Sequence, residues 1–123
     1  MSTAVSSSPF RLPTAPAAVD LVAKYFRGLG DPSRLRILEL LRAEGELSVS
    51  ELVERLRVSQ PKVSNHLACL RWCGFIETRR MGRTVYNRIA DERVEAMLDL
   101  ADSLLADNAA HVAACFRIEG AVR

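Results

Sequence analysis

The feature that most constrains the fold is a pair of short helical patterns followed at once by a strand pattern. Leucine and valine recur at helical spacing over residues 52–58 and again over residues 63–70, and Ser59 separates the two segments. Gly74 then stands where a helix would end, and the apolar period changes from that of a helix to that of a strand. Two short helices joined by a tight turn and followed by a β-hairpin predict a winged helix-turn-helix domain.

Three further helices complete the predicted domain. The first spans residues 17–29, the second begins after the N-cap Asp31 and ends before Gly45, and the last runs from Asp91 to about residue 116. With hairpin strands at 75–80 and 83–89, the predicted fold is mainly α, in the order α-α-α-α-β-β-α. Residues 1–16 are predicted to be a disordered arm, residues 17–118 the domain, and residues 119–123 a short tail.

The last predicted helix is longer than a domain of this size needs to cover its core. Its apolar residues, among them Leu98, Leu104 and Leu105, recur at helical spacing for several turns. Together with the apolar first helix they would leave an exposed patch, which a second copy of the chain would cover. We expect a homodimer paired through the first and last helices. The alternative is a last helix that folds back wholly onto its own core.

The charge of the chain is concentrated in its centre. Residues 57–88 carry seven Lys or Arg and one Asp or Glu, whereas residues 1–56 carry seven of each and residues 89–123 carry three and seven. The positive segment coincides with the second helix of the pair and with the hairpin. A local basic surface of this kind is what binding to DNA phosphates requires, so we expect double-stranded operator DNA as the partner.

The second helix of a helix-turn-helix pair enters the major groove, where short polar side chains near its start reach base edges. Gln60, Ser64 and Asn65 are predicted to read bases, and Arg83 at the hairpin tip is expected to hold the backbone or the minor groove. His66 is expected to make a structural or a phosphate contact and not to bind metal. The full set of predicted DNA contacts is Gln60, Lys62, Ser64, Asn65, His66, Arg71, Arg79, Arg80 and Arg83.

Other classes of function find less support in these residues. A phosphate loop and a nucleophile–base pattern are both missing, and the two histidines fall in separate helices, so neither an enzyme nor a small-molecule substrate is expected. The chain has no apolar run near the ~20 residues of a membrane span and no secretory signal, so we expect a cytoplasmic protein with reduced cysteines and no membrane partner. A protein-interaction module using the last helix is a further alternative, which would lack salt-dependent affinity for DNA.

Two stretches of sequence resemble the ArsR/SmtB family of metal-responsive repressors. Residues 29–38, LGDPSRLRIL, look like the second-helix signature of that family, and residues 60–67, QPKVSNHL, look like its recognition helix. The resemblance covers about residues 18–105. It implies a dimer that binds an imperfect palindrome and dissociates from DNA when a metal ion binds.

The family places its metal sites at several positions, and this chain matches only one of them. Its third helix starts with residues 47–52, LSVSEL, which lack the family's cysteine motif, and the last helix lacks the zinc-binding pattern. Residues 69–73, CLRWC, are similar to the cadmium- and lead-sensing CmtR branch, in which a C-terminal cysteine joins two from the recognition helix. The resemblance therefore implies a metal site made of Cys69, Cys73 and Cys115.

The spacing of the first two cysteines suits this role. Residues four apart on a helix lie one above the other, with roughly 6 Å between their β-carbons, so Cys69 and Cys73 can hold one ion. Lys62 and His66 share their flank and are expected to favour the thiolate form. Three thiolates suit Cd(II), Pb(II) or As(III) as the inducer. Oxidation of the thiols is the alternative signal, and structural burial is the alternative role for the cysteines.

Overall fold

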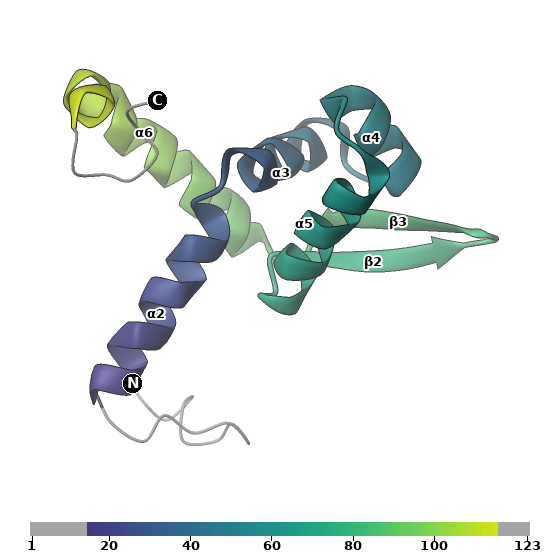
Figure 1. Ribbon diagram of the computed structural model, residues 1–123, viewed down its shortest axis with the longest axis horizontal. Coiled ribbons are helices and arrows are strands. Elements are labelled where there is room, and N and C mark those ends of the chain that lie inside the picture. The colour runs from purple at the N-terminus through teal and green to yellow at the C-terminus, as the bar shows by residue number, and fades with distance from the viewer. Residues whose placement is uncertain (1–14, 116–123) are drawn as a thin grey trace.

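The computed structural model describes residues 15–115, so the predicted tail and residues 1–14 of the predicted arm lie outside it. The predicted mainly helical fold with a β-hairpin is confirmed (Figure 1). The first helix begins two residues earlier than predicted. The elements are α2 (Ala15–Leu29), α3 (Pro32–Glu44), β1 (Leu47–Ser48), α4 (Val49–Leu56), α5 (Gln60–Trp72), β2 (Ile76–Met81), β3 (Thr84–Ile89) and α6 (Glu92–Ala114).

The hairpin is part of a three-stranded antiparallel sheet with the order β1-β3-β2. The short strand β1, which sequence reasoning missed, pairs Leu47 with Asn87 and Ser48 with Tyr86. In the hairpin, β2 and β3 pair from Ile76–Ile89 to Met81–Thr84, and Gly82 adopts a φ of 66° in the turn. The sheet anchors the wing to the start of α4, directly beside the helix pair.

One apolar core joins the helices to the base of the hairpin. Its side chains come from α3, α4, α5, β1, β2 and α6. Helix α5 contributes every third or fourth residue, which is the spacing of residues on one face of a helix. Its fully buried members include Ile37, Leu38, Leu52, Val63, Leu70 and Phe75. This core fixes α5 by one face and leaves its opposite face exposed.

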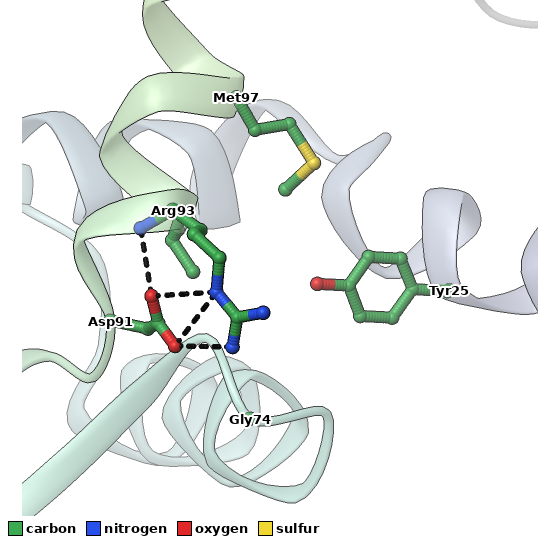
Figure 2. A pocket seen from close by; sticks show the side chains of 6 residues that line it. Tyr25, Gly74, Asp91, Arg93 and Met97 are labelled. Carbon is green, nitrogen blue, oxygen red and sulfur yellow. Dashed lines mark hydrogen bonds and ion pairs between the residues drawn. The ribbon is translucent and has the colours of Figure 1, made fainter. Parts of the chain in front are cut away.

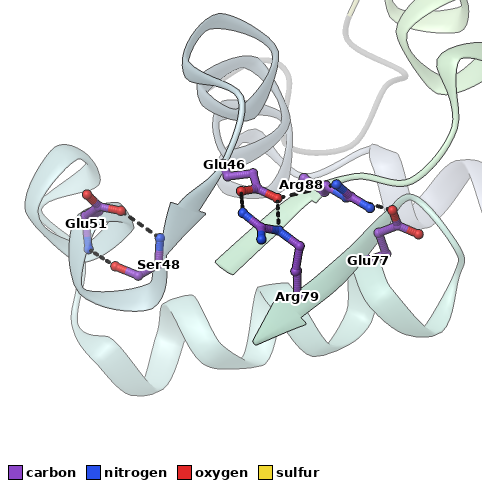
Figure 3. A network of polar contacts seen from close by, with 6 residues as sticks. All are labelled: Glu46, Ser48, Glu51, Glu77, Arg79 and Arg88. Atoms are coloured by element: carbon purple, nitrogen blue, oxygen red, sulfur yellow. Dashed lines mark hydrogen bonds and ion pairs between the residues drawn. The ribbon is translucent and has the colours of Figure 1, made fainter. Parts of the chain in front are cut away.

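The helix starts follow local capping chemistry. Asp31 accepts hydrogen bonds from the backbone N–H groups of Ser33 and Arg34 and so caps α3, as predicted. Ser48 and Glu51 form a reciprocal capping box at α4, shown at the left of Figure 3. Ser59 occupies the N-cap position of α5 but makes no side-chain hydrogen bond there.

Asp91 caps the long helix α6. Its carboxylate accepts a 2.8 Å hydrogen bond from the backbone N–H of Arg93 and further bonds from the guanidinium of the same residue (Figure 2). These bonds outweigh desolvation and lower the pKa of Asp91 to about 2. Arg42 of α3 forms ion pairs with Asp99 and Asp102, which hold the first half of α6 against the core.

The helices α2 and α6 extend away from this core in different directions (Figure 1). Both carry large apolar side chains that the described part of the chain leaves exposed, namely Val19, Leu21, Val22, Tyr25, Phe26, Leu100, Leu104, Leu105 and Val112. The alternative of a last helix folded back wholly onto its own core is therefore wrong. Between residues 15 and 115, the helices are all too short or too polar to cross a membrane.

Candidate functional site

The outer face of α5 presents the residues predicted to read DNA. Val63, Leu67 and Leu70 are buried against the core, so helical geometry turns the intervening side chains to solvent. The predicted contacts Gln60, Lys62, Ser64, Asn65 and Arg71 are all exposed. The polar side chains of α5 that are predicted to contact DNA are therefore accessible to a partner.

The arginines of the hairpin divide into two groups. Arg79 donates hydrogen bonds of 2.9 and 2.5 Å to the Glu46 carboxylate, and Arg88 bonds Glu77 at 2.8 Å (Figure 3). These hydrogen bonds from Arg79 to Glu46 raise the pKa of Arg79 and lower the pKa of Glu46. Arg80 and Arg83 are exposed and have no ion pair within residues 15–115. Arg83, in the turn itself, is the more available cation for a phosphate.

His66 lies on the inner flank of α5. It is half-buried, and its Nδ1 atom is 3.3 Å from a guanidinium nitrogen of Arg34 in α3. Of the two roles that the sequence left open for His66, the structure shows the structural contact.

Cys69 lies in the last turn of α5 and Cys73 forms the C-cap of this helix, where its backbone N–H donates a 3.0 Å hydrogen bond to the carbonyl of Cys69. Both side chains are half-buried, and Cys73 packs against the edge of the core. The expected proximity of the two thiols is confirmed. A methyl group placed on Gly28 of α2 would lie 3.5 Å from the Cys73 sulfur, so this thiol faces the end of α2.

The acidity of Cys73 differs from the expectation. Burial and the neighbouring thiol of Cys69 raise its pKa, and the cations of Arg34 and Lys24 only partly oppose this. The prediction that Lys62 and His66 favour the thiolate is therefore wrong for Cys73. The Cys73 thiol therefore stays protonated at neutral pH until a ligand competes with the proton for the sulfur.

Cys115 lies directly after the last residue of α6 and forms its C-cap. At about 1.5 Å per residue, a helix of this length separates Cys115 from the start of α6 by roughly 34 Å. Within the described chain no three Cys, His, Asp or Glu side chains are close enough to share a metal ion. A three-sulfur site inside one subunit is thus excluded for this arrangement.

Three neighbours of the site were missed by sequence reasoning. Gly28 is buried beside Cys73, Arg34 reaches from α3 to His66, and Trp72, between Arg71 and Cys73, is 92% exposed. A glycine inside an otherwise good helix was the available signal for Gly28, since it marks a close approach. The reach of Arg34 depends on long-range packing, and no local pattern predicts it.

A cavity of about 300 Å³ lies next to this region, between α2 and the start of α6 (Figure 2). The hydroxyl of Tyr25 points into it from the side opposite Asp91, and Met97 and Gly74 line it above and below in the view of Figure 2. The guanidinium of Arg93 at its rim is engaged by Asp91. The junction of α2 with α6 is therefore loosely packed.

A family model described as "Bacterial regulatory protein, arsR family" matches residues 31–78, which hold α3, α4, α5 and the start of β2. A probable mercury resistance operon repressor of Streptomyces lividans is 44% identical over 101 residues, which cover 82% of this chain and 80% of the relative. The chain belongs to the arsR family. Members of this family are DNA-binding transcriptional regulators, which confirms the prediction of a regulator and not an enzyme.

Solved structures of other arsR-like proteins have the same fold. Rv0081 of Mycobacterium tuberculosis aligns with a TM-score of 0.72 and 32% identity, covering 76% of this chain and 94% of that one. Mb0332 of Mycobacterium bovis, a homodimeric winged helix-turn-helix DNA-binding domain, aligns with a TM-score of 0.67 and 32% identity. That alignment covers 81% of this chain and 91% of Mb0332. The prediction of a winged helix-turn-helix fold is thereby confirmed.

Proposed function

We propose that this arsR-family protein is a homodimeric repressor that leaves its operator when a thiophilic metal ion binds Cys69 and Cys73. The observation that carries the proposal is the position of Cys69 and Cys73, one turn apart at the end of the same helix that presents Gln60, Ser64 and Asn65 to solvent. The proposed metal-binding cysteines and the proposed base-reading side chains then belong to the same helix, α5. A metal ion needs to supply a coupling free energy of only ~1–3 kcal/mol to weaken DNA binding.

The proposed DNA surface combines the start of α5 with the tip of the wing. Gln60 and Asn65 have the side chains that bond adenine in the major groove, and Ser64 is a short donor and acceptor beside them. Lys62 and Arg71 on α5, with Arg80 and Arg83 on the wing, are assigned to phosphates. Arg79 and His66 are left out of this surface because Glu46 and Arg34 already bind them.

The proposed dimer pairs α2 and α6 of one subunit with those of the other. Exposed side chains such as Val22, Phe26 and Leu104, which are 54–58% accessible, supply the apolar surface that a partner would bury. The homodimeric state of the relative Mb0332 supports the same assembly. A two-fold dimer would present two recognition helices to an imperfect palindrome.

The choice of ion depends on how many sulfurs the site has. Two thiolates complete the coordination of Hg(II), which favours a linear pair of soft ligands, and the Streptomyces lividans relative is described as a mercury resistance repressor. Cd(II), Pb(II) and As(III) call for a third sulfur, as in the CmtR branch that the cysteine motif resembles. We propose Cys115 of the partner subunit as that third ligand, because its own subunit holds it far from the pair.

Oxidation is the second candidate signal, and the neighbouring thiols of Cys69 and Cys73 favour it, since two adjacent thiols lose two electrons and two protons to form a disulfide. Oxidation of the thiols would require an oxidant such as a peroxide. The raised pKa of Cys73 slows attack on a peroxide because the thiolate is the nucleophile. Metal binding, in which the ion itself displaces the protons, is therefore the preferred proposal.

The deciding experiment titrates Hg(II), Cd(II), Pb(II), As(III) and Zn(II) separately into the reduced protein bound to a labelled fragment of its own promoter. Fluorescence anisotropy follows DNA release while ultraviolet absorption follows sulfur-to-metal charge transfer. Release that parallels charge transfer in wild type, and is lost in the Cys69→Ser/Cys73→Ser protein, supports the proposal. Release by peroxide alone, with no effect of any ion, would support the redox alternative.

A further inference from the structure

The C-cap of α4, Arg57, has a backbone conformation that favours glycine. Its φ of 58° and ψ of 42° lie in the left-handed helical region. The other positive φ angles of the described chain all belong to glycines, at positions 45, 74 and 82. A β-carbon is strained in this region, whereas glycine enters it freely. Arg57 therefore stands at a position where its own side chain destabilises the backbone.

The fold requires this conformation at residue 57. The backbone N–H of Arg57 donates a 2.8 Å hydrogen bond to the carbonyl of Val53, which closes the last turn of α4. Residues 57–59 alone connect α4 to α5, so the chain must change direction within them. The next residue, Val58, already packs its side chain against the core. Any residue with a β-carbon at position 57 would bear the same strain.

The side chain of Arg57 makes no interaction that offsets this strain. It is exposed, and between Ala15 and Cys115 its guanidinium has neither a hydrogen bond nor a carboxylate within ion-pair distance. The neighbouring Arg55, by contrast, donates hydrogen bonds of 2.8 and 2.7 Å to the carboxylate of Glu44. The guanidinium of Arg57 is therefore available to a partner.

Arg57 also lies directly before the proposed base-reading residues. It precedes Gln60, the first residue of α5, by three positions, whereas Arg71 lies next to the last residue of that helix. At about 1.5 Å per residue, the 13 residues of α5 span roughly 20 Å. The major groove is about 12 Å wide, so a helix of this length with a cation at each end can reach phosphates on both sides of the groove.

We propose that Arg57 binds a DNA phosphate at the edge of the groove nearest the start of α5, opposite the phosphate assigned to Arg71. The inference rests on the proposed DNA surface and adds a residue to it. In the free protein the positive φ destabilises the turn, and nothing in the described chain compensates for it. On DNA the guanidinium neutralises a phosphate and releases a counterion. Protein stability and DNA affinity are therefore opposed at residue 57.

Three substitutions at residue 57 separate the charge from the strain. Arg57→Gly removes both, Arg57→Ala removes the charge and keeps the strain, and Arg57→Lys keeps both. Urea denaturation of the full-length protein measures the strain. We expect the glycine variant to unfold at a higher urea concentration than wild type, and the alanine and lysine variants to unfold near the wild-type midpoint.

Binding to a labelled fragment of the protein's own promoter, over a range of salt concentrations, measures the phosphate contact. The slope of log affinity against log salt should fall by about 0.9 for each subunit in the glycine and alanine variants, and should stay at the wild-type value in the lysine variant. The preference among promoter fragments that differ by one base pair should not change, because a phosphate contact carries no sequence information. The glycine variant is thus expected to be more stable than wild type and to bind DNA less tightly.

Arg55→Ala is the matched control. It removes the same charge two positions earlier, from a guanidinium that Glu44 already binds, so we expect the wild-type salt slope. Wild-type slopes in Arg57→Gly and Arg57→Ala would overturn the phosphate contact, and so would a slope in Arg57→Lys as low as that in Arg57→Ala. A changed base preference in Arg57→Gly would overturn it too, because residue 57 would then act by orienting α5. A glycine variant no more stable than the alanine variant would overturn the strain.

The variant Arg83→Ala distinguishes this inference from the proposed DNA surface. A reduced slope in Arg83→Ala, together with wild-type slopes in the uncharged variants of residue 57, would overturn only the role of Arg57. Wild-type protein whose affinity for its promoter does not depend on salt would overturn both. Reduced slopes in Arg83→Ala, Arg57→Gly and Arg57→Ala, with an unchanged slope in Arg55→Ala, support both.

Discussion

The side-chain amide of Asn87 donates a 3.1 Å hydrogen bond to the backbone carbonyl of Leu47, although only 2% of Asn87 is accessible to solvent. The two residues also pair in the backbone register of β1 and β3. Asn87 is the buried polar residue of the described core, so one amide group ties the wing to the strand that precedes α4.

The substitution Asn87→Asp tests this hydrogen bond because it replaces the donating amide NH₂ by a carboxylate oxygen and keeps nearly the same side-chain shape. At neutral pH a buried carboxylate would face the Leu47 carbonyl, so we expect the free energy of unfolding to fall by about 2–4 kcal/mol. Chemical denaturation measures this loss. A protonated carboxyl can donate again, and the loss should shrink toward pH 4; a loss that is the same at both pH values would contradict this assignment.

The two groups of wing arginines should respond differently to substitution by alanine. Arg83→Ala is expected to reduce the slope of log affinity against log salt by about one, because one phosphate contact is lost. Arg79→Ala should leave that slope unchanged, since its guanidinium is bound to Glu46. Anisotropy titrations over a range of salt concentrations measure both. Equal slopes in the two variants would show that the wing is misassigned.

Base reading is separate from the salt response. Gln60→Ala is expected to relax the preference for one base pair in each half-site by about 1–3 kcal/mol while the salt slope stays near the wild-type value. Binding to a set of promoter fragments, each with one base pair changed, measures the preference. An unchanged preference at every position would remove Gln60 from the reading surface.

The raised pKa of Cys73 predicts how metal affinity depends on pH. Because this thiol is protonated at neutral pH and must lose its proton to bind, affinity should rise about tenfold per pH unit from Cys73 alone. Competition with a chelator of known pH dependence, between about pH 6.5 and 8.5, gives the slope. Cys73→Ser should lower the slope by about one; the same slope in that variant would mean that the sulfur does not bind the ion.

The Asp91 cap predicts a stability change in acid. Its pKa is lowered from 3.8 to about 2 in the folded protein, so its contribution to stability is complete above pH 4 and is lost as the pH falls toward 2. Urea denaturation between pH 5 and 2 should therefore show a smaller decline for Asp91→Asn than for wild type. Arg93→Gln removes the main cause of the lowered pKa of Asp91, so this variant should also show a smaller decline than wild type. A decline equal to that of wild type in both would refute the linkage.

Mixed dimers test whether the third sulfur comes from the partner subunit. A Cys69→Ser/Cys73→Ser chain paired with a Cys115→Ser chain regains one complete three-sulfur site of the two in a wild-type dimer. Charge-transfer absorption with Cd(II) should then reach about half of the wild-type value and exceed the mean of the two parent homodimers, because the Cys115→Ser parent keeps only two-sulfur sites and the other parent keeps none. Confirmed heterodimers without added absorption would leave Cys115 outside the site.

Local patterns predicted most of the fold, because helix caps and apolar periodicity act over a few residues. The capping residue Asp31, the buried stripe containing Val63 and the hairpin that turns at Gly82 could all be read this way. The strand β1 could not, since two residues carry no period and their pairing depends on β3, about forty positions away.

The candidate site was predictable only where it is contained in one helix. The contact of Cys69 with Cys73 follows from a spacing of four, and the exposure of Asn65 follows from the same helix. The pairing of Arg79 with Glu46 joins residues 33 apart in the chain, and the raised pKa of Cys73 depends on burial against α2. Packing between distant elements determines both.

Trp72 is the single tryptophan of the chain, and it stands 92% exposed directly beside Cys73. Indole fluorescence from the unlabelled protein therefore arises from one position at the end of the recognition helix. A heavy ion on the neighbouring sulfur quenches such an emitter through spin–orbit coupling. The native protein thus contains its own optical probe, and its emission can be followed in a stopped-flow instrument to time ion capture against departure from a labelled operator.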